Sequence, residues 1–197
     1  MTRSAVSWIV PGWLNPANLF TLLRLVCIPF AVAAILRGEH GRALWIVLAA
    51  GLTDAIDGAL ARRFGMATAA GAYFDPIVDK LFLSCVYIAL GAISSVPLWL
   101  VIEILARDLL ILAGAGAAIL FWKMRDFPPS AWGKASTFLQ IAFSLAVMIG
   151  NAAPGSFAAV PARAGVWPVA VLTAFSGCHY LWITLRRSAP RVDRPPR

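Results

Sequence analysis

DAIDGALARRFGMATAAGAYFDPIVD, residues 54–79, carries four aspartates inside a chain that is otherwise strongly apolar. Asp54 and Asp57 lie three residues apart, so they share one face of a predicted helix. Asp75 and Asp79 lie four residues apart and share one face of the next helix. Only the short polar break RRFGMAT separates the two helices, which predicts an antiparallel pair. The two aspartate faces can therefore meet, and we call these four residues the aspartate motif.

The aspartate motif has the chemistry of a site for divalent metal and phosphate. Carboxylates are costly in lipid, so their presence in an apolar chain indicates function. Four of them in a small volume repel one another, and Mg²⁺ or a related ion relieves this because it prefers oxygen ligands. Two such ions could also assist a phosphoryl transfer. Gly58 and Gly71 would let a substrate approach the backbone, and Arg62 offers a planar fork for phosphate. The alternative, polar residues that only satisfy one another, is disfavoured because few basic residues lie nearby.

The composition predicts an all-α integral membrane protein. The chain has 197 residues, 60% of them hydrophobic and 13% charged, and its mean hydropathy is +0.79. A soluble domain is usually about half apolar and about a quarter charged. Apolar segments predict spanning helices over residues 18–36, 43–63, 70–93, 98–122, 132–151 and 166–185. We therefore expect one domain over residues 18–186, built as a six-transmembrane-helix bundle.

The two ends of the chain are expected to lie outside this bundle. Residues 1–17 are too short and too broken by proline and glycine to span, and Trp8 and Trp13 predict an interfacial segment; a disordered terminus is the alternative. Residues 187–197 form a basic, proline-rich tail that we expect to be disordered. The first apolar segment lacks a small-residue cleavage site, so no cleavable signal peptide is expected.

The formal net charge is +8, and the basic residues lie mostly in the loops and in the tail. Six spanning helices put both termini on one side, together with most of the basic loop residues. The positive-inside rule then predicts a multi-pass cell-membrane protein. Both termini and the opening of the site at the aspartate motif are expected to face the cytoplasm. Anionic lipid headgroups account for the basic charge better than nucleic acid does. Nucleic-acid binding is therefore not expected.

Cysteine and histidine offer no competing site. Cys27, Cys85 and Cys178 lie far apart in apolar stretches without paired spacing, so neither disulfides nor a zinc site are expected. His179 is alone in the last apolar segment, which favours a packed side chain over a ligand.

Two arginines inside apolar segments each have two interpretations. Arg24 could face a nucleotide or lipid phosphate, or its side chain could snorkel to the interface. Arg107 could line a pocket for an anionic acceptor, or it could simply pair with Glu103 one turn away. We favour the pocket for Arg107, because a buried arginine in a membrane helix normally has a function.

The motif also carries a resemblance to a known family. The chain resembles the CDP-alcohol phosphotransferases, whose signature it matches at eight positions with the family's spacing: Asp54, Asp57, Gly58, Ala61, Arg62, Gly71, Asp75 and Asp79.

The resemblance implies a six-helix bundle, commonly a homodimer, that uses CDP-diacylglycerol and membrane lipids. It implies that the aspartate motif binds a pair of Mg²⁺ or Mn²⁺ ions and that Asp79 is the general base. The small residues of the signature would make room for cytidine and pyrophosphate, and Arg62 would bind the pyrophosphate. Lys134 resembles a lysine that contacts the acceptor's phosphate, although an ordinary juxtamembrane lysine is the alternative.

The acceptor alcohol is less clearly indicated. NPANLFTLLRLVCIPF, residues 15–30, resembles the family's phosphatidylglycerophosphate synthase branch, whose acceptor is glycerol 3-phosphate. ILARDLLILAG, residues 104–114, and VPLW before it look more like the CMP-forming cardiolipin synthases, whose acceptor is phosphatidylglycerol. We expect glycerol 3-phosphate first, phosphatidylglycerol as the alternative, and inositol phosphate third.

Two functions of other classes fit the aspartates less well. An intramembrane prenyltransferase also uses aspartates and Mg²⁺ on a diphosphate, but its motifs lack the spacing of Gly58, Arg62 and Gly71. A cation-coupled carrier could use the aspartates as an ion site, but no broken-helix repeat is visible.

Overall fold

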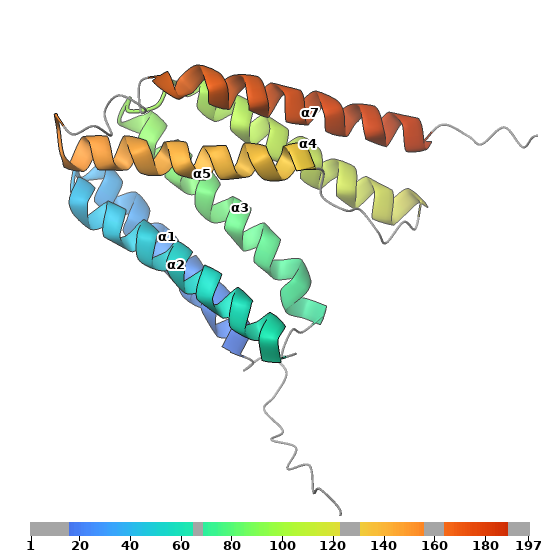
Figure 1. Cartoon of the computed structure of the whole chain (residues 1–197), viewed down its shortest axis with the longest axis horizontal. Coiled ribbons are helices and arrows are strands. Elements are labelled where there is room, and N and C mark those ends of the chain that lie inside the picture. Colours follow the sequence, from blue (N-terminus) through green and yellow to red (C-terminus); the bar gives the residue numbers. More distant parts are fainter. Residues whose placement is uncertain (1–15, 65–68, 123–130, 156–163, 189–197) are drawn as a thin grey trace, which may run out of the picture. The chain divides into compact units, whose positions relative to one another are not determined.

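The computed structural model describes residues 16–64, 69–122, 131–155 and 164–188. In these ranges the chain forms six helices and no strand (Figure 1). The helices are α1 (Pro16–Leu36), α2 (His40–Phe64), α3 (Ala69–Ala92), α4 (Leu98–Trp122), α5 (Ala131–Ala152) and α7 (Val166–Ser188). The prediction of an all-helical chain is confirmed for these residues. The predicted interfacial segment and basic tail lie almost wholly outside them.

The turn between α1 and α2 is shorter than the polar run 37–42 suggests. Gly38 has a φ of +74°, and Glu39 donates its backbone N–H to Ala34 O across it, which closes the end of α1. Arg42, already in the first turn of α2, donates a 2.9 Å hydrogen bond to Glu39. This bond holds the pKa of the Glu39 carboxyl below its ordinary value. Residues 40–42 are therefore the polar first turn of a helix and not a loop.

The chain forms two compact units, residues 1–89 and 90–197. In the first unit α1 and α2 pack side by side, and their three-residue connection makes them antiparallel (Figure 1). Buried alanines line this pair: Ala31 and Ala34 on α1, and Ala43 and Ala50 on α2. Small residues let helix backbones approach closely, which is how helices commonly associate in membranes.

In the second unit α7 packs against both α4 and α5. The rings of Trp99 and Trp167, near the first residues of α4 and α7, lie 5.7 Å apart, so these two helices run parallel. Asn151, near the end of α5, donates a 2.9 Å hydrogen bond to Ser95, just before α4. α5 is therefore antiparallel to α4 and α7, as expected for successive helices that cross a layer up and down.

Among the described residues, two helices are long and apolar enough to cross a membrane, Ala131–Ala152 and the Val166–Ile183 part of α7. The apolar helix segment Thr21–Leu36 is shorter. Large apolar side chains are also exposed along these helices, for example Phe138 and Val171. Such exposure is typical of surfaces that meet lipid or a partner. Six helices are confirmed, while six membrane spans stay a prediction.

Gly114 of α4 lies close to Tyr180 of α7. A Cβ added there would lie 2.9 Å from Cε1 of Tyr180, whereas one added at Gly116 of the same helix would meet nothing within 4 Å. We expect G114A to lower the free energy of unfolding by about 1–3 kcal/mol through overpacking. The matched variant G116A should be neutral or stabilising by up to about 1 kcal/mol, because alanine favours helix. Reversible unfolding in mixed micelles would measure both, and equal effects would contradict the contact.

Candidate functional site

The aspartate motif lies on two successive helices of the first unit. Asp54 and Asp57 are on α2, while Asp75 and Asp79 are on α3. Gly58, Ala61 and Arg62 also lie on α2, and Gly71 lies on α3. The predicted helical spacing is therefore confirmed for the backbone. The side chains of residues 54–76 lie outside the described part of the structure, so their meeting stays a prediction.

Asp79 is the motif residue whose side chain is described, and it forms an ion pair with Arg24 of α1. The two side chains differ sharply in exposure, 6% for Arg24 and 48% for Asp79. Arg24 is thus buried among the helices and pairs with a carboxylate of the chain, which argues against the snorkelling interpretation. Because Arg24 Nη1 meets Oδ1, the exposed carboxylate keeps room for a second interaction.

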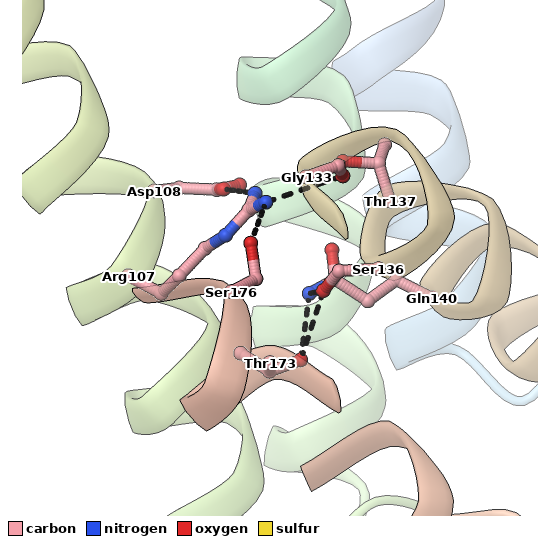
Figure 2. Close-up of polar contacts among 8 residues, drawn as sticks. All are labelled: Arg107, Asp108, Gly133, Ser136, Thr137, Gln140, Thr173 and Ser176. Carbon is pink, nitrogen blue, oxygen red and sulfur yellow. Dashed lines mark hydrogen bonds and ion pairs between the residues drawn. The ribbon is translucent and has the colours of Figure 1, made fainter. Parts of the chain in front are cut away.

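A second polar centre lies in the other compact unit, around Arg107 of α4. Figure 2 shows its guanidinium at the junction of α4, α5 and α7. Nη1 donates to Asp108 at 2.6 Å, and Nη2 donates to Ser176 Oγ at 2.8 Å and to Gly133 O at 3.2 Å. Arg107 and Asp108 are only 5% and 7% exposed. We call these four residues the Arg107 network.

The Arg107 network corrects one predicted alternative. Arg107 pairs with the adjacent Asp108 and not with Glu103 one helical turn away. Packing between helices decides the pairing. The guanidinium donors point to a buried junction that includes α5 and α7, and Asp108 supplies the carboxylate there. Nε of Arg107 is buried without a hydrogen-bond partner among the described residues, so its N–H is left unsatisfied there.

A buried ladder of polar side chains lies beside the Arg107 network, between α5 and α7 (Figure 2). Gln140 donates to Thr173 Oγ1 at 3.0 Å and to Ser136 Oγ at 3.4 Å. Thr137 donates to Gly133 O at 3.1 Å, the same carbonyl that accepts from Arg107. These bonds fix the register of α5 on α7. The sequence offered a signal for them, since polar residues recur on one face of each apolar helix.

Lys134 follows Gly133 directly and is exposed. The carbonyl of Gly133, the residue before Lys134, accepts a hydrogen bond from Arg107. Arg107 is the other residue predicted to bind the acceptor alcohol. Their side chains differ, because Arg107 is buried and committed to the network while Lys134 is exposed at the start of α5. Binding of an acceptor by either residue stays a prediction.

The remaining candidate residues behave as the sequence suggests. Cys27, Cys85 and Cys178 are free. His179 lies between the rings of Phe175 and Trp182, at 6.2 and 6.1 Å, which fits a packed side chain. Among the side chains that the structure describes, no three acidic, histidine or cysteine residues gather as metal ligands, but three residues of the aspartate motif lie outside that set.

Comparison with known proteins places this arrangement in context. A family model described as CDP-alcohol phosphatidyltransferase matches residues 14–176, a range that contains every predicted site residue. A Mycobacterium tuberculosis protein named as a probable phosphatidylglycerophosphate synthase is 36% identical over 179 residues, 87% of this chain and 82% of that protein. A Rickettsia felis protein named CDP-diacylglycerol–glycerol-3-phosphate 3-phosphatidyltransferase is 32% identical over 173 residues, 84% of this chain and 93% of its own length. A Streptomyces coelicolor protein named cardiolipin synthase (CMP-forming) is 32% identical over 141 residues, 66% of this chain and 64% of its own length.

Proposed function

Because this chain belongs to the CDP-alcohol phosphatidyltransferase family, we propose that it moves the phosphatidyl group of CDP-diacylglycerol to glycerol 3-phosphate and releases CMP. This is the activity of a phosphatidylglycerophosphate synthase. The observation that carries the proposal is the aspartate motif, whose four residues lie with the family's spacing on the consecutive helices α2 and α3.

The residues of the aspartate motif fit a divalent metal site. Each offers only carboxylate oxygens, which Mg²⁺ and Mn²⁺ prefer as ligands. Asp79, the one whose side chain is described, is 48% exposed and so keeps an oxygen accessible beside Arg24. Asp54, Asp57, Asp75 and Asp79 would hold two such ions, whose charge would offset that of the substrate's pyrophosphate and of the departing CMP.

Asp79 would accept the proton of the acceptor hydroxyl as the hydroxyl oxygen attacks the phosphorus that bears the diacylglycerol. The bond from that phosphorus to the CMP oxygen breaks, and CMP leaves. Gly58, Ala61 and Gly71 leave space for cytidine and pyrophosphate beside the helix backbones. Arg62 would bind the pyrophosphate through its planar fork.

Arg107 and Lys134 would bind the phosphate of the acceptor. The unpartnered Nε–H of Arg107 is a donor that the network leaves over, and Lys134 is an exposed ammonium close to the same backbone turn. A single anionic group between two cations is a common way to hold a phosphate. The arrangement therefore supports a phosphorylated acceptor, but it suits glycerol 3-phosphate and phosphatidylglycerol alike.

The relatives favour glycerol 3-phosphate. The two relatives whose names specify phosphatidylglycerophosphate synthesis align over 87% and 84% of this chain, and the cardiolipin synthase aligns over 66%. The alternative acceptor, phosphatidylglycerol, keeps the support of the Arg107–Asp108 segment, which resembles that of cardiolipin synthases. The donor, the leaving group and the roles of the aspartates are the same for both acceptors.

The proposal includes the setting of the enzyme. The chain would be a multi-pass cell-membrane protein whose single domain, residues 18–186, spans the bilayer six times and acts as a homodimer. Both termini and the mouth of the site would be cytoplasmic. The two helices apolar enough to span and the exposed apolar side chains support this setting.

The test is CMP release by the purified protein in detergent with CDP-diacylglycerol and Mg²⁺, comparing glycerol 3-phosphate with phosphatidylglycerol. We expect release with glycerol 3-phosphate. Release with phosphatidylglycerol alone would identify a cardiolipin synthase. Release with neither acceptor would overturn both assignments and direct the search to inositol phosphate.

Lys134 offers a direct test of the acceptor site because its side chain is exposed. We expect K134A to raise KM for glycerol 3-phosphate by about 10-fold or more, the loss of one charge-assisted hydrogen bond. KM for CDP-diacylglycerol and the melting temperature should not change. A KM for glycerol 3-phosphate equal to that of the wild type would assign Lys134 to the membrane surface.

A further inference from the structure

We propose that Arg24 is a positioning residue that orients the carboxylate of Asp79 for its role in the reaction. This inference rests on the proposed function, since it assigns Asp79 to the reacting site. Arg24 lies on α1, a helix that carries no residue of the aspartate motif.

Arg24 is almost completely buried. The whole residue is 5% exposed. Asp79, with which it forms the ion pair, lies 55 positions further along the chain, on α3. A buried guanidinium carries a large desolvation cost that only a well-placed anion offsets. Because Arg24 is buried, its side chain lacks the conformational freedom of a surface arginine. The carboxylate that pairs with it is therefore held at a fixed position relative to α1.

The two side chains of the ion pair differ sharply in exposure. The Asp79 side chain is 48% exposed although Arg24 is almost fully covered. The guanidinium therefore approaches the carboxylate from the buried side and leaves the other side open. A carboxylate can accept several hydrogen bonds or ligands at once, so the pair can fix the orientation of Asp79 while its second oxygen meets a proton or a metal ion.

This geometry separates two possible actions of Arg24 on a bound ion. If Arg24 orients Asp79, its removal should weaken metal binding, because partners of metal ligands typically contribute about 10–100-fold to affinity or activity. If Arg24 only adds a positive charge beside the carboxylates, its removal should tighten metal binding. The sign of the change therefore decides between them.

The experiment titrates Mn²⁺ into metal-free wild type, R24Q and R24K in detergent by calorimetry, and measures kcat and KM for CMP release on the same samples. For R24Q we expect an about 10-fold weaker Mn²⁺ affinity and a kcat about 10–100-fold lower, with KM for CDP-diacylglycerol unchanged. R24K keeps the charge without the planar fork, so it should lie between wild type and R24Q.

The matched control is R42Q, which removes an arginine whose ion pair with Glu39 lies in the exposed turn before α2. It should leave Mn²⁺ affinity and kcat unchanged. If R24Q does not fold, R24K decides: lowered affinity and kcat in R24K support the proposal, and wild-type values overturn it.

Three results for a folded R24Q would overturn the positioning role. Tighter Mn²⁺ binding would show a competing charge, and unchanged affinity with unchanged kcat would show that Arg24 has no role in the site. A raised KM for CDP-diacylglycerol with normal Mn²⁺ affinity would show direct binding of substrate phosphate. Because the Mn²⁺ titration needs no substrate, it stays informative even if neither acceptor supports CMP release, so the two proposals can fail separately.

Discussion

Replacing Asp79 with asparagine is expected to lower kcat for CMP release by about 10³-fold or more, because the variant loses a proton acceptor and a metal ligand together. Asparagine has the size of aspartate and can still accept a hydrogen bond from Arg24, so the packing should be retained, while loss of the anion beside the buried guanidinium should lower the free energy of unfolding. KM for CDP-diacylglycerol should change little, since a loss confined to kcat marks an interaction made in the transition state. Rates of CMP release and binding of CDP-diacylglycerol measure the two effects.

The control for D79N is E39Q. Glu39 is likewise an acid paired with an arginine, Arg42, at 2.9 Å, but it lies in the turn between α1 and α2. Its neutralisation should leave kcat within about twofold of the wild-type value, because an exposed ion pair contributes little to stability. A kcat for D79N within tenfold of wild type would remove Asp79 from the role of general base and would leave the aspartate motif as a binding site only.

The helices of this chain could be predicted from sequence because one physical signal dominates them. Runs of about 20 apolar residues separated by short polar breaks allow few arrangements other than helices. The boundaries of α4 match the prediction, and those of α5 differ by one residue at each end. The start of α2 was missed because its first turn, residues 40–42, is polar and is held by the Glu39–Arg42 pair.

The aspartate motif could be predicted because its information is local. Helical spacing alone places its residues in pairs on α2 and α3, and a run of few residues joins the two helices. The link to Arg24 could not be predicted in this way. Nothing in a single sequence indicates which of the distant acids a buried arginine of α1 will meet, because that depends on how α3 packs in the first unit.

The Arg107 network shows where a local rule fails. The i, i+4 spacing favours Glu103 as a partner on an isolated helix, where such a pair gains about 0.2–0.5 kcal/mol. Burial against α5 and α7 changes the balance, because a covered guanidinium must satisfy as many donors as it can. Asp108, Ser176 and Gly133 together offer three acceptors at one point, which a single carboxylate one turn away does not.

Replacing Arg107 with methionine is therefore expected to destabilise the protein by about 3–5 kcal/mol, the usual cost of removing one partner of a buried ion pair. Methionine fills part of the volume of the arginine stem but removes the guanidinium donors to Asp108 and to the Gly133 carbonyl. Reversible unfolding in mixed micelles would measure the loss, with K134A as the comparison in the same turn of α5.

The double variant R107M/D108N separates charge from packing. Removing both partners of a buried pair is usually much less costly than removing one, so the double variant should recover a large part of the stability that R107M loses. If R107M unfolds no more easily than wild type and only KM for glycerol 3-phosphate rises, the network contributes little and Arg107 serves the acceptor alone. If both stability and KM change, the residue has two roles, because the network that holds α4, α5 and α7 together would also fix the unpartnered Nε–H for the acceptor phosphate.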